Sequence, residues 1–219
     1  TTSKKNSHEQ ILESFGRGDA DILIGTQMIV KGHDFSRVTL VGVLLADLTL
    51  FSGDYRAGER TFDLLTQAAG RAGRGDVPGK VVIQTYKPDN YAITAAASQD
   101  YRAFYDIEEA YRSLMRYPPE WNMMVIMGTG MDEEQLANIM DRMYSLIRGK
   151  YINAGHLSVI GPSEPAISKI KDVYRRVLYI KHRDYRMLVD VKDYVEEWLK
   201  ENGENDVSVF FDLNPVNMY

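Results

Sequence analysis

The segment Gln67-Ala-Ala-Gly-Arg71-Ala-Gly-Arg74 closes a stretch, residues 60–69, whose apolar spacing predicts a helix. Two arginines three residues apart on one helical turn point the same way, and the glycines at 70 and 73 leave a bare surface for a ligand. Planar guanidinium groups match phosphoryl oxygens and stabilise the charge of phosphoryl transfer. We therefore expect Arg71 and Arg74 to be catalytic arginine fingers, Gln67 to position water or sense a nucleotide, and Gly70 to lie against it. A solvated Gly-Arg turn is the alternative for this segment alone.

A second polar segment, Gly25-Thr-Gln-Met-Ile-Val-Lys-Gly-His-Asp-Phe35, directly follows a predicted buried strand at 21–25. Ligands of α/β sheets bind at the carboxyl ends of strands, so its side chains are candidates for a binding site. We expect Thr26, Gln27 and Lys31 to contact a nucleic-acid backbone. Gly32 and Asp34 are expected to touch the nucleotide ribose. An ordinary loop with a helix-capping aspartate is the alternative.

The first half alternates short apolar runs with helical patterns, which indicates a parallel sheet covered on both faces. We expect strands at 21–25, 38–45 and 80–85, and helices at 9–15, 60–69 and 90–116. Pro118-Pro119 ends the last helix, and we place a domain boundary there, between 1–117 and 118–219.

The second half has the order β-α-β-β-α-β, which is that of a split βαβ sandwich with two helices on one face of a sheet. The expected strands are 122–128, 157–161, 174–181 and 207–212, and the expected helices are 132–150 and 184–202. Its methionines are expected to fill the core. The fold class is thus α/β followed by α+β.

The stretch from Lys169 to Arg186 is the richest in basic residues and is interleaved with tyrosines, a composition suited to DNA. Arg175, Arg176 and Lys181 are the candidate DNA-binding residues. The alternative is that alternation along a strand divides them between two faces, so that part of the stretch is the wet side of a sheet.

Together, the two polar segments resemble motifs V and VI of superfamily 2 helicases. With Asp54-Tyr-Arg-Ala-x-Glu-Arg60 added, they are similar to the primosomal protein N′ (PriA) family of bacterial replication-restart DNA helicases. The resemblance implies a truncated RecA-like lobe 2 with a trailing helix, entered after its opening strands, and then a domain similar to a βαββαβ ribosomal protein. The role of the 54–60 signature is left open, and a charge cluster that caps a helix is an equal alternative. Leu45 stands where the family usually has an acid, which leaves Asp47 as the local carboxylate.

The resemblance also implies function. The full-length protein would be an ATP-dependent 3′–5′ helicase that recognises stalled forks and restarts replication by primosome assembly, with ATP, Mg²⁺ and zinc as cofactors. Its partners would be forked and single-stranded DNA, single-strand DNA-binding protein and other primosome proteins. Arg186 is the candidate for contact with the acidic tail of the single-strand DNA-binding protein.

Several motifs are missing from the sequence. There is no GxxxxGK[ST] segment and no DExH box, so we expect no ATPase activity from this chain alone. With no cysteine and four scattered histidines we expect no metal site, and with no long apolar run we expect no membrane contact and a cytoplasmic setting. The net charge of −5 restricts any DNA contact to a local patch. The alternatives are a DNA- or protein-binding module without a motor, and a ribosomal-type RNA-binding domain fused to an unrelated α/β unit.

Overall fold

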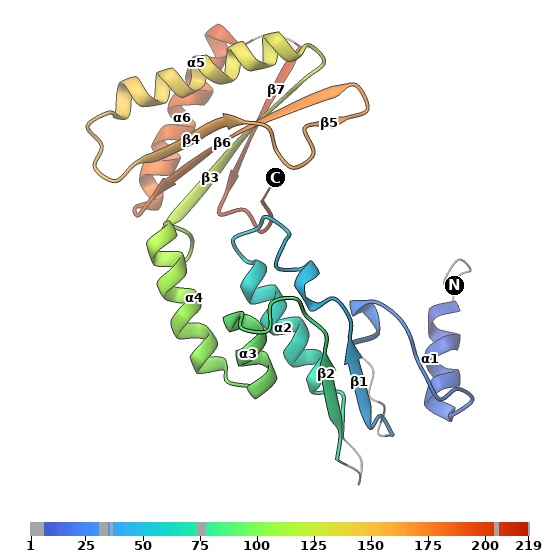
Figure 1. Ribbon diagram of the computed structural model, residues 1–219. Coiled ribbons are helices and arrows are strands. Elements are labelled where there is room, and N and C mark those ends of the chain that lie inside the picture. The colour runs from blue at the N-terminus through green and yellow to red at the C-terminus, as the bar shows by residue number, and fades with distance from the viewer. Residues whose placement is uncertain (1–6, 31–34, 36, 74–77, 204–205, 219) are drawn as a thin grey trace. The chain divides into compact units, whose positions relative to one another are not determined.

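The computed structural model describes residues 7–30, 35, 37–73, 78–203 and 206–218 (Figure 1). The contacts divide the chain into two compact units. The first comprises the described residues of Thr1–Ser52 together with Arg56–Asp106, and the second comprises Gly53–Tyr55 together with Ile107–Tyr219. A short segment of the first half therefore belongs to the second unit.

The first unit contains a parallel pair of strands, in which Leu40 of β1 lies opposite Lys80 of β2. The first half of the chain consists of α1 (Ser7–Arg17), η1 (Gln27–Val30), β1 (Leu40–Val43), η2 (Ala46–Leu48), α2 (Ala57–Ala69), β2 (Lys80–Ile83), α3 (Tyr91–Ser98) and α4 (Tyr101–Met115). The core of the unit forms where α2 packs on α3 and on the start of α4. Phe62 and Phe104 stack there with ring centroids 4.4 Å apart. The expected parallel pairing is confirmed.

Two elements of the first half differ from the sequence prediction. The apolar run at 21–25 forms no strand, and its Ile22 and Ile24 side chains are 77% and 88% exposed. An extended segment becomes a strand only when another strand pairs with it, and none of the described residues does so. The single helix predicted at 90–116 is two helices. Gln99 adopts the left-handed conformation (φ 56°), and Asp100 accepts a hydrogen bond from Ala103 N at 2.9 Å, which starts the second helix.

The second unit is built on an antiparallel sheet in the strand order β4-β6-β3-β7, with the short β5 paired to β6. Its elements are β3 (Asn122–Gly130), α5 (Glu133–Tyr151), β4 (Ser158–Ser163), β5 (Lys169–Ile170), β6 (Val173–His182), α6 (Tyr185–Asn202) and β7 (Val207–Leu213). The alternation of strands and helices is the one predicted, with β5 as an additional element.

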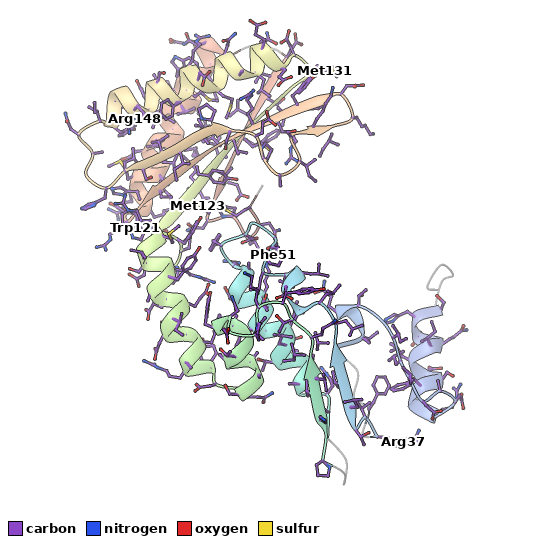
Figure 2. All side chains as sticks on the ribbon, in the orientation of Figure 1. Arg37, Phe51, Trp121, Met123, Met131 and Arg148 are labelled. Atoms are coloured by element: carbon purple, nitrogen blue, oxygen red, sulfur yellow. The ribbon has the colours of Figure 1, made fainter. Side chains whose placement is uncertain are left out.

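Both long helices cover one face of this sheet, as Figure 1 shows. Each helix begins at an aspartate whose carboxylate accepts a backbone N–H, at 3.0 Å for Asp132 and 2.9 Å for Asp184. The core between helices and sheet contains fully buried methionines, Met124, Met140 and Met143 among them, so the expectation that methionines fill the core is confirmed. Trp121 just before β3 and Met123 at its start are both buried (Figure 2).

Candidate functional site

The Gly-Arg segment follows a helix and does not continue it. Helix α2 ends at Ala69, and the next backbone N–H groups bond back over a tight turn: Gly70 to Thr66 O at 3.0 Å, Arg71 to Ala68 O at 3.1 Å. The prediction that both arginines lie on one helical turn is therefore wrong, because the helix stops before the first of them. Arg74 lies outside the described residues.

Gly73 fixes the end of this turn. Its φ of +74° belongs to the left-handed region, and a Cβ added there would lie 2.4 Å from the backbone nitrogen of Gly79. Its N–H donates to Val38 O at 3.0 Å. Val38 lies two residues before β1 and Gly79 immediately precedes β2, so the turn lies beside the amino ends of the parallel strands. Ligand binding at the carboxyl ends of strands therefore does not account for this segment.

The backbone donors at this turn are used within the protein. Every backbone N–H from Gly70 to Gly73 already donates within the protein, because Ala72 N also bonds to Ala69 O at 3.2 Å. Gln67 is exposed on the last turn of α2, and Arg71 is half-buried just beyond it. Between Gly70 and Gly73, therefore, no backbone N–H is left to cradle a phosphate.

The second polar segment is described only in its first half. Thr26 and Gln27 are exposed at the start of the short helix η1, where Ile29 N donates to Thr26 O at 3.1 Å. The η1 helix contacts α2, so this segment neighbours the helix that precedes the Gly-Arg turn. Lys31, Gly32 and Asp34 lie outside the described residues.

Asp47 has a structural role at the carboxyl ends of β1 and β2. One carboxylate oxygen accepts from the Thr85 hydroxyl at 2.7 Å, and the other accepts from Tyr86 N at 2.9 Å. The hydrogen bond from Thr85 is the main cause that lowers the pKa of Asp47, and that from Tyr86 is the next. The carboxylate ties together the segments that leave the two strands, and its oxygens are used for this purpose.

The basic side chains predicted to bind DNA do not form one surface. Arg175 donates to Ile167 O at 3.1 Å and to Met127 Sδ at 3.5 Å. Arg176 points to the face with the helices and lies 3.8 Å from the Glu133 carboxylate. Lys181 is only 6% exposed, and its ammonium donates to Met115 O at 3.1 Å. The alternation along β6 that divides the two arginines between faces is confirmed.

The sequence of the chain was compared with protein-family models and with curated proteins. The model described as "Helicase conserved C-terminal domain" matches residues 1–76, and "Primosomal protein N C-terminal domain" matches residues 113–216. The replication restart protein PriA of Bacillus subtilis is 41% identical over 220 residues, which are all of this chain and 27% of that protein. Those of Synechocystis and Haemophilus influenzae are each 34% identical over all of this chain, covering 26% and 30% of their lengths.

The chain belongs to the PriA family. It is the C-terminal part of a helicase-containing protein and spans less than a third of the length of these relatives. Of the sequence features that the PriA resemblance rested on, the segment at 54–60 is the one whose role the residues alone left open.

Tyr55 of that PriA-family segment is buried in the second unit. Its ring is 5% exposed and stacks on Tyr117, with centroids 5.1 Å apart and planes 11° from parallel. Its hydroxyl donates to Pro215 O at 3.2 Å, and the Arg112 guanidinium lies 5.6 Å from its ring centroid. Sequence reasoning missed this cluster because its members are up to 160 residues apart. The one available signal was the aromatic residue inside a charged signature.

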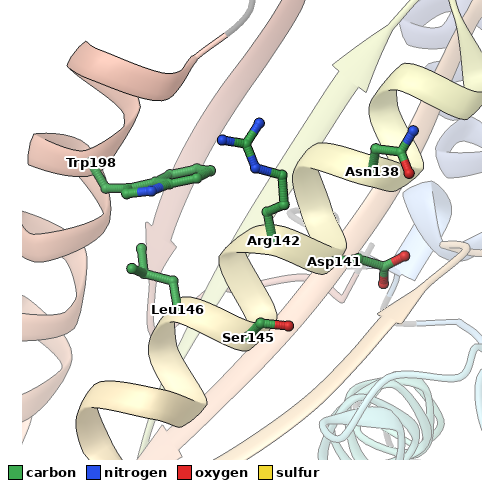
Figure 3. A pocket seen from close by; sticks show the side chains of 6 residues that line it. All are labelled: Asn138, Asp141, Arg142, Ser145, Leu146 and Trp198. Atoms are coloured by element: carbon green, nitrogen blue, oxygen red, sulfur yellow. The ribbon is translucent and has the colours of Figure 1, made fainter.

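Two further surfaces lie in the second unit. Arg186 is exposed in the first turn of α6. A shallow groove of about 530 Å³ lies between α5 and α6, where Arg142 stacks over Trp198 with 4.9 Å between guanidinium carbon and ring centroid (Figure 3). Arg142 also donates to Asn202 Oδ1 at 3.2 Å, and Asp141 lines the same groove, so the groove is of mixed charge.

The described residues contain neither a metal-binding cluster nor a membrane-spanning helix. Among the described residues, no three His, Asp or Glu side chains gather in a way that would hold a metal ion. None of the helices in that part of the chain is long and apolar enough to span a membrane.

Proposed function

We propose that this chain is the C-terminal part of an ATP-dependent 3′–5′ DNA helicase that recognises stalled forks and restarts replication by primosome assembly. The observation that carries the proposal is the match of the whole chain to relatives named replication restart protein PriA. The turn that Gly73 closes, with the exposed Gln67 and the half-buried Arg71 beside it, supports the motor part of the proposal, because an amide and a guanidinium suit a nucleotide phosphate.

In this proposal Arg71 and Arg74 stabilise the charge on the transferred phosphoryl group, and Gln67 positions water or senses the nucleotide. A guanidinium suits the phosphoryl oxygens of a nucleoside triphosphate, and Gly70, which has no side chain, allows the ligand to approach closely. Gly32 and Asp34 would complete the nucleotide contacts. Because the backbone donors of the turn are used internally, the phosphate cradle and the Mg²⁺ ligands must come from the rest of the protein. The isolated chain is accordingly inactive, and zinc, too, would be bound elsewhere in the full-length protein.

Exposed apolar side chains on the first unit support the proposal that this unit is a partial RecA-like lobe 2. Ile22, Ile24, Leu40 and Leu44 are all strongly exposed. A surface of this kind marks a contact with other protein. We propose that the remaining strands of the lobe cover it, with the boundary to a split βαβ domain at residue 118.

DNA contacts are proposed for Thr26, Gln27 and Lys31 in the first unit, and for Arg175 and Arg176 in the second. Arg186 is the proposed contact for the single-strand DNA-binding protein, because it is exposed and cationic. Lys181 is better placed to hold the second unit together than to meet phosphates, because its ammonium is buried.

The decisive experiment uses the full-length protein and compares Arg71→Ala and Arg74→Ala with the exposed Arg148→Ala as a matched control. A lost finger lowers single-stranded-DNA-stimulated ATP hydrolysis by about 10³-fold or more, while DNA affinity measured by fluorescence anisotropy stays within about twofold. Normal turnover of both variants would overturn the finger assignment. A wild-type protein with no DNA-stimulated hydrolysis would overturn the proposed function.

The second candidate function is a DNA- or protein-binding module without a motor. The internal use of the backbone donors around Gly70 favours it for the isolated chain. Binding of this chain to forked and single-stranded DNA over a salt series tests it, with Arg175→Glu and Arg176→Glu as variants. Both should weaken binding and flatten its salt dependence. Unchanged binding would show that these arginines make no contact with DNA.

A further inference from the structure

Basic side chains gather on one tryptophan at the end of the second unit's sheet, where β3 begins and β6 ends. Trp121 directly precedes β3 and is only 4% exposed (Figure 2). The guanidinium carbon of Arg116 lies 5.0 Å from the centroid of its ring, and that of Arg183 lies 5.4 Å from the same centroid. The imidazole of His156 meets the indole edge-on, with 6.2 Å between centroids. These four residues form the Trp121 cluster.

The two arginines of the Trp121 cluster are held by the ring and not by hydrogen-bond acceptors. Both side chains are exposed. Within the described part of the chain, neither guanidinium donates a hydrogen bond, and no carboxylate lies within the 4.0 Å of an ion pair. A cation over an aromatic face needs no acceptor, so the N–H donors of both groups stay available to a ligand.

The other tryptophan of the chain shows an arginine whose donors and charge are matched by the protein. Arg142 lies over Trp198 at a similar distance, 4.9 Å, but it also donates to Asn202 Oδ1 at 3.2 Å and shares its groove with the Asp141 carboxylate. Among the described residues, the arginines of the Trp121 cluster have no such neighbours. Although the net charge of the chain is −5, this end of the sheet is therefore locally positive.

The surroundings of the cluster support a preformed basic site. The positive charge of Arg116 adds to the effect of burial in lowering the pKa of Lys181 to about 8. Lys181 itself is only 6% exposed, so it senses the charge of the site without facing a ligand. The loop that carries His156 is tied to the end of β6, because Nε2 of His182 bonds to Gly155 O at 3.0 Å. The second unit thus holds the parts of the site in place by its own contacts.

We propose that Arg116 and Arg183 form a phosphate-binding site, which takes the phosphate groups of a single-stranded nucleic-acid backbone or of a free polyphosphate. A planar guanidinium binds phosphate oxygens with two donors at once, and a ligand with successive phosphates can engage both arginines. The site is separate from Arg175 and Arg176 and does not depend on ATP hydrolysis, so it goes beyond the proposed function. The competing explanation is that the two cations only cover the indole of Trp121.

Heteronuclear NMR of this chain can follow the site through its own indole N–H group. The chain has two tryptophans and therefore two indole signals, which Trp198→Phe assigns. Pyrophosphate, or an oligo(dT) of about 12 nucleotides, should shift the Trp121 signal in a saturable way and leave the Trp198 signal in place. A tighter response to oligo(dT) assigns the site to a nucleic-acid backbone, and a tighter response to pyrophosphate assigns it to a free polyphosphate.

Three results of this titration would overturn the proposal. They are an unmoved Trp121 signal, an equal shift of the Trp198 signal, and an equal response to acetate at the same ionic strength. The second result would show that any arginine over a tryptophan responds to anions. The third would show that the site does not distinguish phosphate from other anions.

Variants of the two arginines separate binding from a covering role. Arg116→Gln and Arg183→Gln should each lower the affinity for the better ligand about tenfold, because each removes charged hydrogen bonds. Arg183→Lys keeps the charge but loses the planar donors, so its affinity should lie between those of wild type and Arg183→Gln. Arg148→Gln, an exposed arginine on α5, is the matched control and should stay within about twofold of wild type.

Urea unfolding of the same variants tests the competing explanation. If the arginines bind phosphate, the midpoint of unfolding without ligand should change little in Arg183→Lys, while the affinity for the ligand falls. If they only cover Trp121, the midpoint falls in both Gln variants and the affinity of the folded protein for phosphate stays at the wild-type value. That second pattern would overturn the proposal.

Discussion

Raising the pH should stabilise the second unit, because Lys181 is a buried cation. Burial lowers the pKa of its ammonium from the ordinary 10.5 to about 8, and the nearby charge of Arg116 adds to the effect. The ammonium is held by Met115 O and by the ring of Tyr117, and its environment is otherwise poor in water.

The sign follows from proton binding. Between about pH 8 and pH 10.5 the unfolded chain holds a proton on Lys181 that the folded chain has lost, so the free energy of unfolding rises with pH. From pH 7 to pH 9.5 the full shift corresponds to at most about 2 kcal/mol, and partial hydration of the ammonium reduces this to about 1 kcal/mol. Burial also raises the pKa of Tyr117. Above about pH 10 the tyrosine ionises more readily in the unfolded chain than in the folded chain, so the free energy of unfolding falls again.

Urea unfolding followed by tryptophan fluorescence reports on the unfolding of the second unit. The chain has two tryptophans, Trp121 and Trp198, and both lie in the second unit. The free energy of unfolding at pH 9.5 should exceed that at pH 7 by about 1 kcal/mol in wild type, and the difference should disappear in Lys181→Met. Lys150→Met is the matched control, because Lys150 also lies over a tyrosine ring, at 3.4 Å, but is exposed. A flat profile in wild type, or an equal rise in Lys181→Met, would refute the reasoning.

Three other predictions concern the residues that shape the site. Gly73→Ala should lower the free energy of unfolding of this chain, measured by calorimetry, by roughly 1–3 kcal/mol, because the added Cβ meets the backbone nitrogen of Gly79. Gly42→Ala is the control and should be tolerated, because there is open space around Gly42. Glu108→Gln should lower the free energy of unfolding in urea by about 3 kcal/mol, because it removes the carboxylate that pairs with the buried Arg112 charge. Replacing both side chains with Leu and Met should lower it by less. Asp47→Asn should speed amide exchange at residues 84–87, measured by mass spectrometry, because one of the two acceptor oxygens becomes an NH2 donor; equal exchange would contradict the structural role of Asp47.

Local signals explain why much of the second unit could be predicted. Its helices begin at aspartates that cap them, and its strands are long apolar runs that find partners within the same unit. Where the prediction failed, the deciding contact was not local. The run at 21–25 has a strand-like composition, but pairing requires a neighbour. The break at Gln99 depends on one left-handed residue that a helical pattern does not reveal.

The candidate site divides in the same way. The residue types of the Gly-Arg turn, and the need for glycine in it, could be read from the sequence because both are properties of a short segment. That the backbone donors of residues 70–73 are used within the protein depends on where the turn packs. The prediction of one basic patch on β6 was wrong for another reason. Arg175 and Arg176 are adjacent in sequence, but the pleat of the strand directs them to opposite faces of the sheet.

The sequence by itself determined the family, the alternation of elements and the residue types of the Gly-Arg turn, because these depend on residue identity and spacing. Only the tertiary structure decided that Tyr55 is buried against Tyr117 and Pro215, and that Lys181 is a buried cation and not part of a DNA-binding patch. The physical reason is the same for Tyr55 and for Lys181. Burial and stacking are properties of groups brought together from distant parts of the chain, and no local pattern in the sequence records which groups will meet.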